Sequence, residues 1–576
     1  MTIQGPPPPQ EVTPLERWTR WSKENLFSSF FNSVLSIASI AIAALAIRGL
    51  FSFVFAPERK WYVIPPNMKL YWTDVYPPEV MGRMWVTLGL VLTLTGLSLA
   101  IWRVGGHLTP ARLARVAASV GSSLLVLAAL VSIPAIVRIW IAVVGVICWA
   151  ASWLIKLLWS GGEEAETIST MWVLIGTLVA VLAVLWALHI ETGTKVSLTV
   201  QAAVFIGAYI VGLVVRDWIP NAVTRSSLVA FWLLSLPLVY LVIQRDPDVS
   251  AVPVTTMVIP FAAAFAIVGA AYMWWAGSAN PGEVAKLVAA LLFVAAIASW
   301  FTSIAMLPRF LLLALAVFGL AAPTFGGTDQ GRKGLVIGWV VMDLLIAYFM
   351  TMAMAKTGIP VLGDFIGGLN LTFLLSIAGI VLAFPIGIML ALGRTSTMPI
   401  FRLLSTGYIE VVRGVPLITV LFFANLVINR FLPQDIRLDD IIKAMIAVAL
   451  FAAAYLAENI RGGLQSIPKG QREAAQAVGL STVQMTVLIT LPQALRAVIP
   501  AIVGQVITLF KDTSLVAIIG LADFLRIARD VVPNQPGSLG SMQESLLFAV
   551  VIYWIFSFGT SRASMRLEKK LGVGER

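Results

Sequence analysis

The chain has 576 residues, of which 59% are hydrophobic and 12% are charged, and its formal net charge is +11. Soluble globular proteins carry about 25% charged residues, so the composition excludes that class and predicts a polytopic all-α membrane protein. The apolar runs are long and continuous, which excludes the alternating pattern of an outer-membrane barrel. The positive charge indicates Lys and Arg kept on the cytoplasmic side of a membrane rather than nucleic-acid binding.

Residues 1–31 are expected to form a cytoplasmic tail that leads into an uncleaved first span, because no signal-peptide pattern precedes it. That span is predicted at about residues 32–55, and a second one at about 80–102. Between them lies a stretch rich in Trp, Tyr and Pro, residues 57–79. A basic loop follows the second span, so the positive-inside rule places the aromatic stretch outside and the N-terminus inside.

Residues 119–322 contain a dense series of apolar runs, which predicts about six to eight crossings. The runs 119–159 and 284–322 each fit one long tilted helix or two short helices broken near Pro134 and Pro308. The loops of this region carry few charges, so the charge bias gives little guidance on their orientation.

The chain is expected to consist of three parts: the tail, a multi-span extension at 32–356 and a C-terminal core at 357–576. Together they are expected to hold about 14–16 transmembrane helices. After a span near 335–355, the core is predicted to hold five more, at about 371–393, 403–430, 441–463, 496–521 and 545–563. Basic residues follow the first and the last of these five, which places the loop at about 464–495 and the C-terminus in the cytoplasm.

The loop at 464–495 is a polar, helix-forming island in an apolar sequence. Ser466 is expected to cap a first short helix. Gly479 supplies the left-handed residue that ends this helix, and Ser481 with Gln484 forms a capping box that opens a second one. Two short helices that meet at a glycine predict a compact, protruding elbow.

The loop contains Glu-Ala-Ala, then a glycine after three further residues, and Ile-x-Leu-Pro nine residues later. This spacing resembles the EAA signature loop of the membrane subunits of ATP-binding-cassette (ABC) importers. An ordinary cytoplasmic loop that happens to begin with Glu-Ala-Ala is the alternative. The expected coupling residues of the loop are Glu473, Ala474, Ala475, Gly479, Ser481, Ile489, Leu491 and Pro492.

Three further runs, at 408–417, 454–462 and 510–515, are similar to the polar-amino-acid branch of these importers, although Val415 stands where threonine is usual. The resemblance covers about residues 364–565. The first span and the Trp/Pro-rich outer stretch are similar to the larger membrane subunits of general L-amino-acid importers. The additional spans of the extension go beyond the family pattern, and no function is assigned to them.

The resemblance implies a type I importer fold in the bacterial cytoplasmic (inner) membrane. It implies that the elbow docks in a groove of a separate ATPase subunit, which carries ATP and Mg. It also implies a second membrane subunit, either the same chain or a homologous one, and an extracytoplasmic amino-acid-binding protein. No phosphate-binding loop of the form G-x4-GK[ST] occurs in this chain, which agrees with a separate ATPase.

Ionisable residues within the expected spans are candidates for the substrate path. Glu458 and Arg461 lie three residues apart on one helical face and can pair. An amino acid needs an acid near its ammonium group and a base near its carboxylate, so these two residues are hypothesised to line the path together with Lys511 and Thr513. A purely structural role in helix packing or in a subunit interface is the alternative.

Glu410 and Arg413 precede Pro416 and are predicted to fix a kink or a gate. Asp343 and His189 are isolated polar residues in apolar runs, and neither is assigned a function. No group of His, Cys and carboxylate residues has the spacing of a metal site, and no nucleophile–base–acid trio is recognisable. Neither a metal nor a catalytic residue is therefore expected.

The predicted function is the transmembrane subunit of an ATP-driven amino-acid importer rather than an enzyme. A non-transporting membrane receptor or scaffold that tethers an ATPase is one alternative, and an ion-coupled secondary transporter is another. The sequence does not determine which amino acids are carried, or whether the second membrane subunit is identical or homologous.

Overall fold

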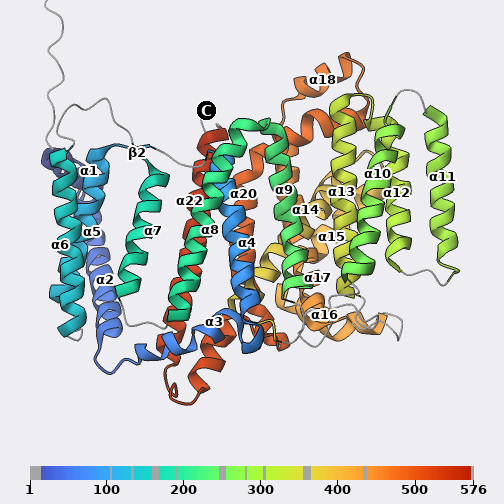
Figure 1. Ribbon diagram of the computed structural model, residues 1–576. Coiled ribbons are helices and arrows are strands. Elements are labelled where there is room, and N and C mark those ends of the chain that lie inside the picture. The colour runs from blue at the N-terminus through green and yellow to red at the C-terminus, as the bar shows by residue number, and fades with distance from the viewer. Residues whose placement is uncertain are drawn as a thin grey trace, which may run out of the picture. The chain divides into compact units, whose positions relative to one another are not determined.

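The computed structural model describes residues 14–103, 107–130, 135–158, 168–187, 192–244, 254–278, 282–302, 306–353, 365–431 and 438–571 (Figure 1). In these ranges the chain is helical apart from one antiparallel pair of two-residue strands, β1 (His107–Leu108) and β2 (Ile168–Ser169). The all-α class predicted from the sequence is therefore confirmed. The chain divides into two compact units, residues 1–61 with 107–170, and residues 62–106 with 171–576.

The first unit contains four helices, two of which form a closely packed pair. Its helices are α1 (Pro14–Asn25), α2 (Phe30–Phe55), α5 (Pro110–Leu130) and α6 (Ala135–Leu158). Two glycines let α5 and α6 approach closely, because a Cβ added at Gly121 would lie 2.7 Å from the carbonyl oxygen of Gly145. Ser152 donates a 2.7 Å hydrogen bond to the carbonyl of Ala114 across the same interface.

The second unit begins with an N-terminal part that corresponds to most of the expected extension. Its helices are α3 (Met68–Thr73), α4 (Gly82–Ile101), α7 (Thr170–Ala187), α8 (Thr192–Trp218), α9 (Asn221–Pro237), α10 (Ile259–Ala276), α11 (Gly282–Ser299), α12 (Met306–Phe325) and α13 (Asp329–Ala353). Short 3-10 turns at Trp61–Val63, Pro65–Asn67 and Pro78–Val80 flank α3, and π-helical turns at Leu238–Ile243 and Val254–Val258 directly follow α9 and directly precede α10. Pro134 and His189 lie outside the described residues.

The C-terminal part of this unit is the core that carries the elbow. It contains α14 (Gly368–Arg394), α15 (Pro399–Gly414), α16 (Leu417–Phe431), α17 (Asp440–Ser466), α18 (Lys469–Ala477), α19 (Thr482–Met485), α20 (Leu491–Asp512), α21 (Phe524–Arg526) and α22 (Met542–Leu571). Further short turns are π-helical at Thr486–Thr490 and Ile527–Val531, and 3-10 at Thr513–Ile519 and Val532–Asn534.

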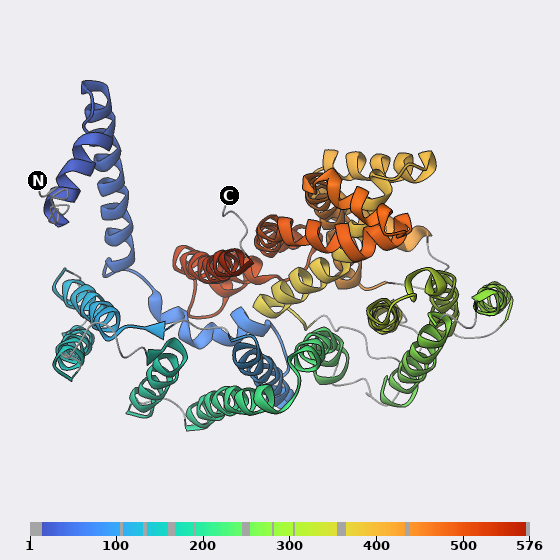
Figure 2. The same ribbon diagram turned by 90° about the horizontal axis from the view of Figure 1, so that it is seen from above.

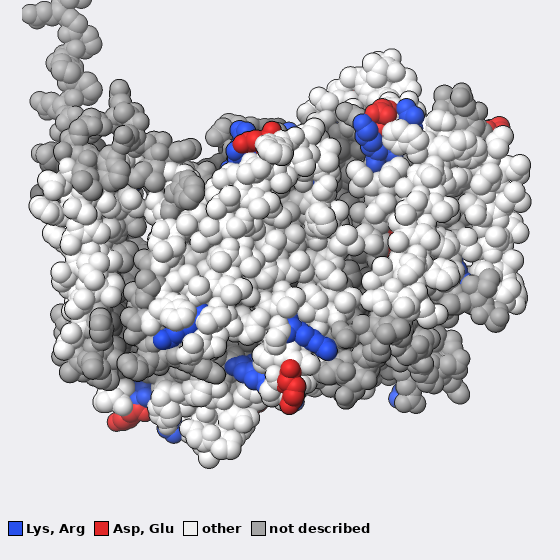
Figure 3. All heavy atoms as spheres, viewed as in Figure 1, with Lys and Arg blue, Asp and Glu red and all other residues white. Residues whose placement is uncertain are grey.

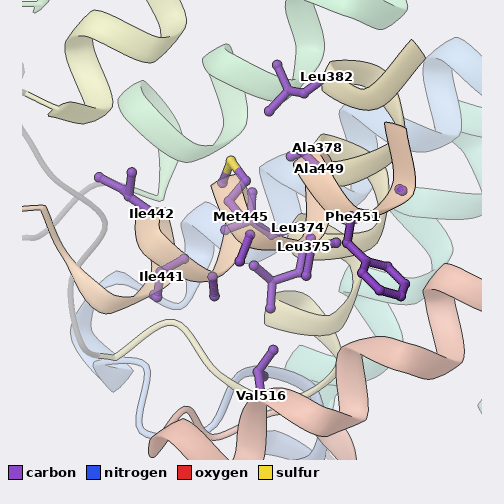
Figure 4. Close-up of a cluster of buried hydrophobic side chains, with 14 of the residues drawn as sticks. Leu374, Leu375, Ala378, Leu382, Ile441, Ile442, Met445, Ala449, Phe451 and Val516 are labelled. Carbon is purple, nitrogen blue, oxygen red and sulfur yellow. The ribbon is translucent and has the colours of Figure 1, made fainter. Parts of the chain in front are cut away.

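Helix α17 is the centre of the core. It packs against α14, α15, α16 and α20, and 17 of its 27 residues are buried. Figure 4 shows Leu374, Leu375 and Ala378 of α14 facing Met445 and Ala449 of α17. None of these side chains is branched at Cβ. The alanines are small and the larger side chains fill the gaps between the helices, so the two helices run close together over most of their length.

Nine helices of the described ranges have the length and composition to cross a membrane, and the bent pair α15–α16 makes a tenth. The larger number of 14–16 stays a prediction, because several expected spans run into residues outside these ranges. On the face seen in Figure 3, charged side chains of the described residues lie near the ends of the helices, with an uncharged band between them. Such a band is what a bilayer requires.

The expected span at 403–430 is bent in the structure. It is divided into α15 and α16, whose axes are bent by 105° and which together are long and apolar enough for one broken span or a re-entrant segment. Pro416 follows the break, and Val415 has the extended backbone that a residue before proline prefers (φ −107°, ψ 136°). The kink expected at Pro416 is present, and the crossing of the membrane at 403–430 stays a prediction.

A buried polar chain joins the extension to the core. Gln244 donates to the Thr87 hydroxyl of α4 (3.1 Å) and accepts from the Asn370 amide of α14 (2.7 Å). Tyr240 donates to the side-chain oxygen of Asn370 at 3.0 Å. Gln244 is fully buried and Asn370 nearly so. Because buried polar groups are costly unless they are paired, this chain of hydrogen bonds fixes α4 and the Leu238–Ile243 turn against α14.

The Trp/Pro-rich stretch after the first span is not a separate loop but packs on the core. The Tyr71 hydroxyl of α3 lies 2.6 Å from the Ser545 hydroxyl of α22, and its ring lies 4.8 Å from that of Phe548. Asn67 donates to Ser538 at 3.1 Å. Gly368 has a φ of +61° where its backbone passes Tyr71, a conformation that favours glycine.

Candidate functional site

The predicted elbow is present as two short helices between α17 and α20. Helix α18 (Lys469–Ala477) carries the Glu-Ala-Ala sequence, and α19 (Thr482–Met485) follows after a tight turn. Figure 1 shows α18 standing beyond the ends of the long helices. Glu473 and Ala474 are exposed, whereas Ala475 points inward and is buried. The elbow therefore presents a polar face to its surroundings.

Gly479 ends α18 in a Schellman motif. Its φ is +80°, its N–H donates to the carbonyl of Gln476 (2.9 Å), and the N–H of Leu480 donates to the carbonyl of Ala475 (3.1 Å). These two bonds satisfy carbonyls that the end of a helix leaves without a partner. The role predicted for Gly479 as the left-handed terminator is confirmed.

The second helix begins with the expected capping box. The N–H of Gln484 donates to the Ser481 hydroxyl at 3.3 Å, and the Ser481 N–H donates to the Gln484 side chain at 3.0 Å. A π-helical turn then leads into α20, with Pro492 in its first turn. Ile489 and Leu491, the two apolar positions of the motif, are half-buried at this junction.

The cap predicted for α18 was wrong. Ser466 is the last residue of α17, and its hydroxyl donates to the carbonyl of Gly463 at 2.8 Å. The N-cap of α18 is Pro468, which makes no side-chain cap bond. Two intervening residues in extended backbone separate the helices, so the serine terminates one helix rather than starting the next. Instead, Gln493 of α20 donates to the Gln471 side chain (3.4 Å) and holds α18 from the side.

A cluster of ion pairs lies at the end of the core helices nearest the elbow. Glu458 of α17 accepts from Arg394 of α14 (2.6 Å) and from Arg461 one turn away (2.8 Å). Arg413 of α15 is 3.7 Å from the same carboxylate, and Arg394 also binds Glu410 of α15 at 2.7 Å. The predicted Glu458–Arg461 pair is confirmed, but it is part of a larger cluster that ties three helices together.

Glu410 and Arg413 do not pair with each other, although both belong to this cluster. Arg413 also lies over the Tyr455 ring, with 5.3 Å between its guanidinium carbon and the ring centre. Both residues lie on α15 within two turns of the bend at Pro416. The cluster thus holds the segment that precedes the bend.

Lys511 and Thr513 are not brought near Glu458 and Arg461. Helices α17 and α20 are joined through the elbow, so they run in opposite directions, and Lys511 lies about 30 Å along α20 from the elbow end. Lys511 is exposed beside Asp512, and Thr513 is buried and donates to the carbonyl of Phe510 at 2.8 Å. The four hypothesised path residues therefore form two separate groups.

Two charged residues of the core were missed by the sequence reasoning. Arg394 was counted among the basic residues of a loop, but it is the last residue of α14 and bridges two carboxylates. Lys443 is buried at the opposite end of α17, where it binds Asp440 and the Asn425 side chain at 2.5 and 2.9 Å. The partners of Arg394 are distant in sequence, so no local pattern marks it. Asp440 and Lys443, by contrast, have the spacing of a pair within one helix, and the Asn425 contact comes from the neighbouring helix α16.

Buried carboxylates outside the elbow and the ion-pair cluster include Asp523, in the segment between α20 and α22, and Asp74, at the end of α3. Asp523 is fully buried and accepts from the N–H groups of Leu525 (2.9 Å) and Arg526 (3.2 Å). Burial raises the pKa of Asp523 to about 6, against the opposing effect of these hydrogen bonds. Burial also raises the pKa of Asp74, while Arg526 opposes this shift.

Among the residues that the structure describes, no three His, Cys, Asp or Glu side chains are grouped so that they could hold a metal ion. The arrangement consists of an exposed, polar elbow and of ion pairs that link α14, α15 and α17. Chemically, it offers exposed polar groups on the elbow and charge-assisted contacts between helices.

Comparison with known proteins places this arrangement in a family. Residues 383–573 match the family model described as "Binding-protein-dependent transport system inner membrane component". The inner membrane amino-acid ABC transporter permease protein YhdY of Escherichia coli K12 is 44% identical over 253 residues, which are 44% of this chain and 69% of that protein.

Two further relatives cover different shares of their own length. The glutamate/glutamine/aspartate/asparagine transport system permease protein BztC of Rhodobacter capsulatus is 44% identical over 46% of this chain and 62% of that protein. The glutamate/aspartate import permease protein GltK of Escherichia coli O6:H1 is 37% identical over 37% of this chain and 95% of that protein. The chain therefore belongs to the family of binding-protein-dependent transport system inner membrane components, as a permease related to those of amino-acid ABC transporters.

Proposed function

We propose that this chain is the transmembrane subunit of an amino-acid importer in the bacterial cytoplasmic membrane, with ATP bound as its Mg complex and hydrolysed on a separate subunit. The substrate class is supported by the printed names of the relatives, which refer to amino-acid transport. A second membrane subunit and an extracytoplasmic binding protein complete the proposed assembly. The elbow is the observation that carries the coupling role.

The elbow is suited to docking because it is stiff, polar and exposed. A Schellman motif ends its first helix, a capping box begins its second, and α18 is tied to α20 by a hydrogen bond between glutamines. Such a unit moves as a body rather than yielding when a partner pushes on it. In the proposed assembly it lies on the cytoplasmic side, where Glu473 and Ala474 face a groove of the ATPase.

The ion-pair cluster is suited to closing the path near the elbow. Glu458 joins the ends of α14, α15 and α17, and its carboxylate is satisfied by three arginines. Each charged group of the cluster already has a partner of opposite charge, which leaves few free contacts for an amino acid, so we assign the cluster to a gate. Its contacts would break when the ATPase moves the elbow and α17 with it.

Lys511 at the other end of the core remains the better candidate for substrate contact. Lys511 is exposed and the neighbouring Asp512 is half-buried, and their side chains project in different directions, so the outer end of α20 carries charges of both signs. A zwitterionic amino acid needs charges of both signs. We propose that this end of α20 meets the substrate after the binding protein releases it.

The test is the complete transporter, purified with its ATPase and reconstituted with its binding protein, with Glu473→Arg compared with Thr397→Arg. Thr397 is exposed in the turn between α14 and α15 on the side of the core that carries the elbow, so it controls for an added charge. Wild type and Thr397→Arg should bind the ATPase and take up amino acids on ATP addition. Glu473→Arg should lose both.

The alternatives predict different results in the same assay. A receptor or scaffold would bind the ATPase without ATP-dependent uptake. An ion-coupled transporter would lose uptake with an uncoupler and keep it without the ATPase. If Glu473→Arg binds the ATPase and transports like wild type, the elbow has no coupling role.

A further inference from the structure

The turn between α12 and α13 lies against the elbow. Helix α12 contacts α19, and a Cβ added at Gly327 would lie 3.8 Å from the side-chain nitrogen of Gln484. Gln484 is the residue that completes the capping box of α19. Figure 1 shows α18 at the same end of the helices as this turn. A part of the extension, far away in sequence, thus touches the second helix of the elbow.

The α12–α13 turn packs tightly against the end of α10. A Cβ at Gly326 would overlap the backbone of Gly277 at the end of α10, so the two segments pack backbone to backbone. The Thr328 hydroxyl accepts from the N–H of Gly331 at 3.0 Å, a local bond that shapes the start of α13. Arg332 lies over the Trp274 ring with 5.1 Å between its guanidinium carbon and the ring centre.

The charged residues of the turn pair with one another. Asp329 binds Lys333 at 2.8 Å and lies 3.8 Å from Arg332, one helical turn along α13. The hydrogen bond from Lys333 holds the pKa of the Asp329 carboxyl below its ordinary value. One acid and two bases leave the turn with a net charge of +1, and the contact with the elbow that carries the argument is the approach of Gly327 to the Gln484 side chain.

We propose that the α12–α13 turn is a seat for α19, which positions the elbow for productive contact with the ATPase. This inference rests on the proposed function and deepens it by giving the extension a part in coupling. A docked elbow must transmit a push without rotating away from α20. The hydrogen bond between Gln471 and Gln493 restrains α18. The α12–α13 turn, which belongs to the extension, restrains α19 through the contact of Gly327 with Gln484.

The first experiment tests the contact itself in the assembled transporter. In a Cys148→Ser background, Gly327→Cys with Gln484→Cys is treated with a short bifunctional thiol reagent, and cross-linked peptides are mapped by mass spectrometry. Gly334→Cys with Gln484→Cys is the control, because Gly334 is exposed on α13 with nothing near its side-chain position. Cross-linking of the first pair alone supports the seat; equal or absent cross-linking of both overturns it.

The second experiment tests positioning with Gly327→Trp and the control Gly334→Trp. The ratio of amino acid taken up to ATP hydrolysed should fall by about 2- to 30-fold in Gly327→Trp, the range expected for residues that modulate coupling, while the ATPase stays bound. The control should match wild type. An unchanged ratio in Gly327→Trp overturns the proposal.

The two experiments separate this inference from the proposed function. If wild type transports amino acids and Gly327→Trp does so with the same efficiency, the function stands and the seat falls. If wild type shows no ATP-driven uptake, the proposed function fails, and the cross-link still decides whether the turn seats α19. The cross-link also keeps the proposal testable if the tryptophan variant does not assemble.

Discussion

At the scale of single residues, Gly479 just after α18 and Gly470 within it have opposite effects on the stability of the elbow. Gly479 has a φ of +80°, which costs an L-amino acid about 1–2 kcal/mol. Gly470 lies inside α18 with nothing within 4 Å of its side-chain position, and there glycine costs about 0.5–1 kcal/mol relative to alanine. The elbow therefore needs the first glycine and only tolerates the second.

We expect Gly479→Ala to loosen the elbow and Gly470→Ala to stiffen it. Hydrogen exchange of the amides from Gln476 to Leu480 should be about 5- to 30-fold faster in the first variant, following the cost of the left-handed backbone. ATPase binding should weaken in parallel. Equal exchange rates in Gly479→Ala and wild type would contradict the Schellman assignment.

Asp523 gives a residue-scale prediction about pH. Its pKa is raised by burial to about 6 from an ordinary value of 3.8, so the folded state binds a proton more tightly than the unfolded state. The stability from this group is fully present below pH 3.8 and is lost as the pH rises through about 6. Asparagine keeps an oxygen that caps α21 and has no charge to bury.

Asp523→Asn should therefore melt at a higher temperature than wild type, and the difference should grow between about pH 5 and pH 7.5. In terms of unfolding free energy, the advantage of the variant should grow by about 1–3 kcal/mol over this range. Asp530→Asn is the control of opposite sign, because Arg529 lowers the pKa of Asp530. Its exposed pair should give only a slight loss toward higher pH. A margin for Asp523→Asn that shrinks with rising pH would refute this account.

At the scale of elements, the Glu458 cluster decides how α14, α15 and α17 hold together. Glu458→Gln would leave three arginines near one another without their shared carboxylate. Because hydrogen bonds to charged groups contribute about 1.5–3 kcal/mol each, we expect a clear loss of thermal stability. If the cluster is a gate, substrate should also leak through the variant without ATP.

The matched control for this variant is Glu283→Gln, which removes an exposed ion pair with Lys286 on α11. Exposed pairs contribute about 0–1 kcal/mol, so the melting temperature and the leak should stay at wild-type values. A Glu458→Gln variant as stable and as tight as this control would show that the cluster neither joins the helices nor closes the path.

How much of these elements the sequence predicts depends on the distance between partners. Gly479 and the Ser481–Gln484 box were predicted correctly, because cap and partner lie within a few residues. The role of Ser466 was predicted wrongly, because a serine can end one helix as well as begin the next. Hydropathy alone does not reveal the 105° bend after α15. Arg394 was missed because its carboxylate partners are 16 and 64 residues away in the chain.

At the scale of the whole molecule, the part of the extension that belongs to the second unit packs against the core and is not linked to it by the chain alone. The expected domain boundary at 357 follows a change in sequence pattern, and it stays a prediction. The second unit nevertheless contains both the core and most of the extension. The two parts are joined by the buried hydrogen bonds from Thr87 to Asn370 and by the contact of Tyr71 of α3 with Ser545 of α22. Sequence patterns did not reveal these contacts, because Gln244 and Asn370 are 126 residues apart in the chain and no local motif connects them.

The Tyr240–Gln244–Asn370 chain has a consequence for anyone who would exchange parts between permeases of this family. A core cut away from its extension would leave the buried Asn370 amide, in the first turn of α14, without its acceptor, and a buried polar group without a partner costs about 1–3 kcal/mol. A chimera that joins this core to a foreign extension inherits that penalty unless the graft brings an acceptor to the first turn of α14. The seam for recombination is therefore set by these hydrogen bonds and not by the position of a loop in the sequence.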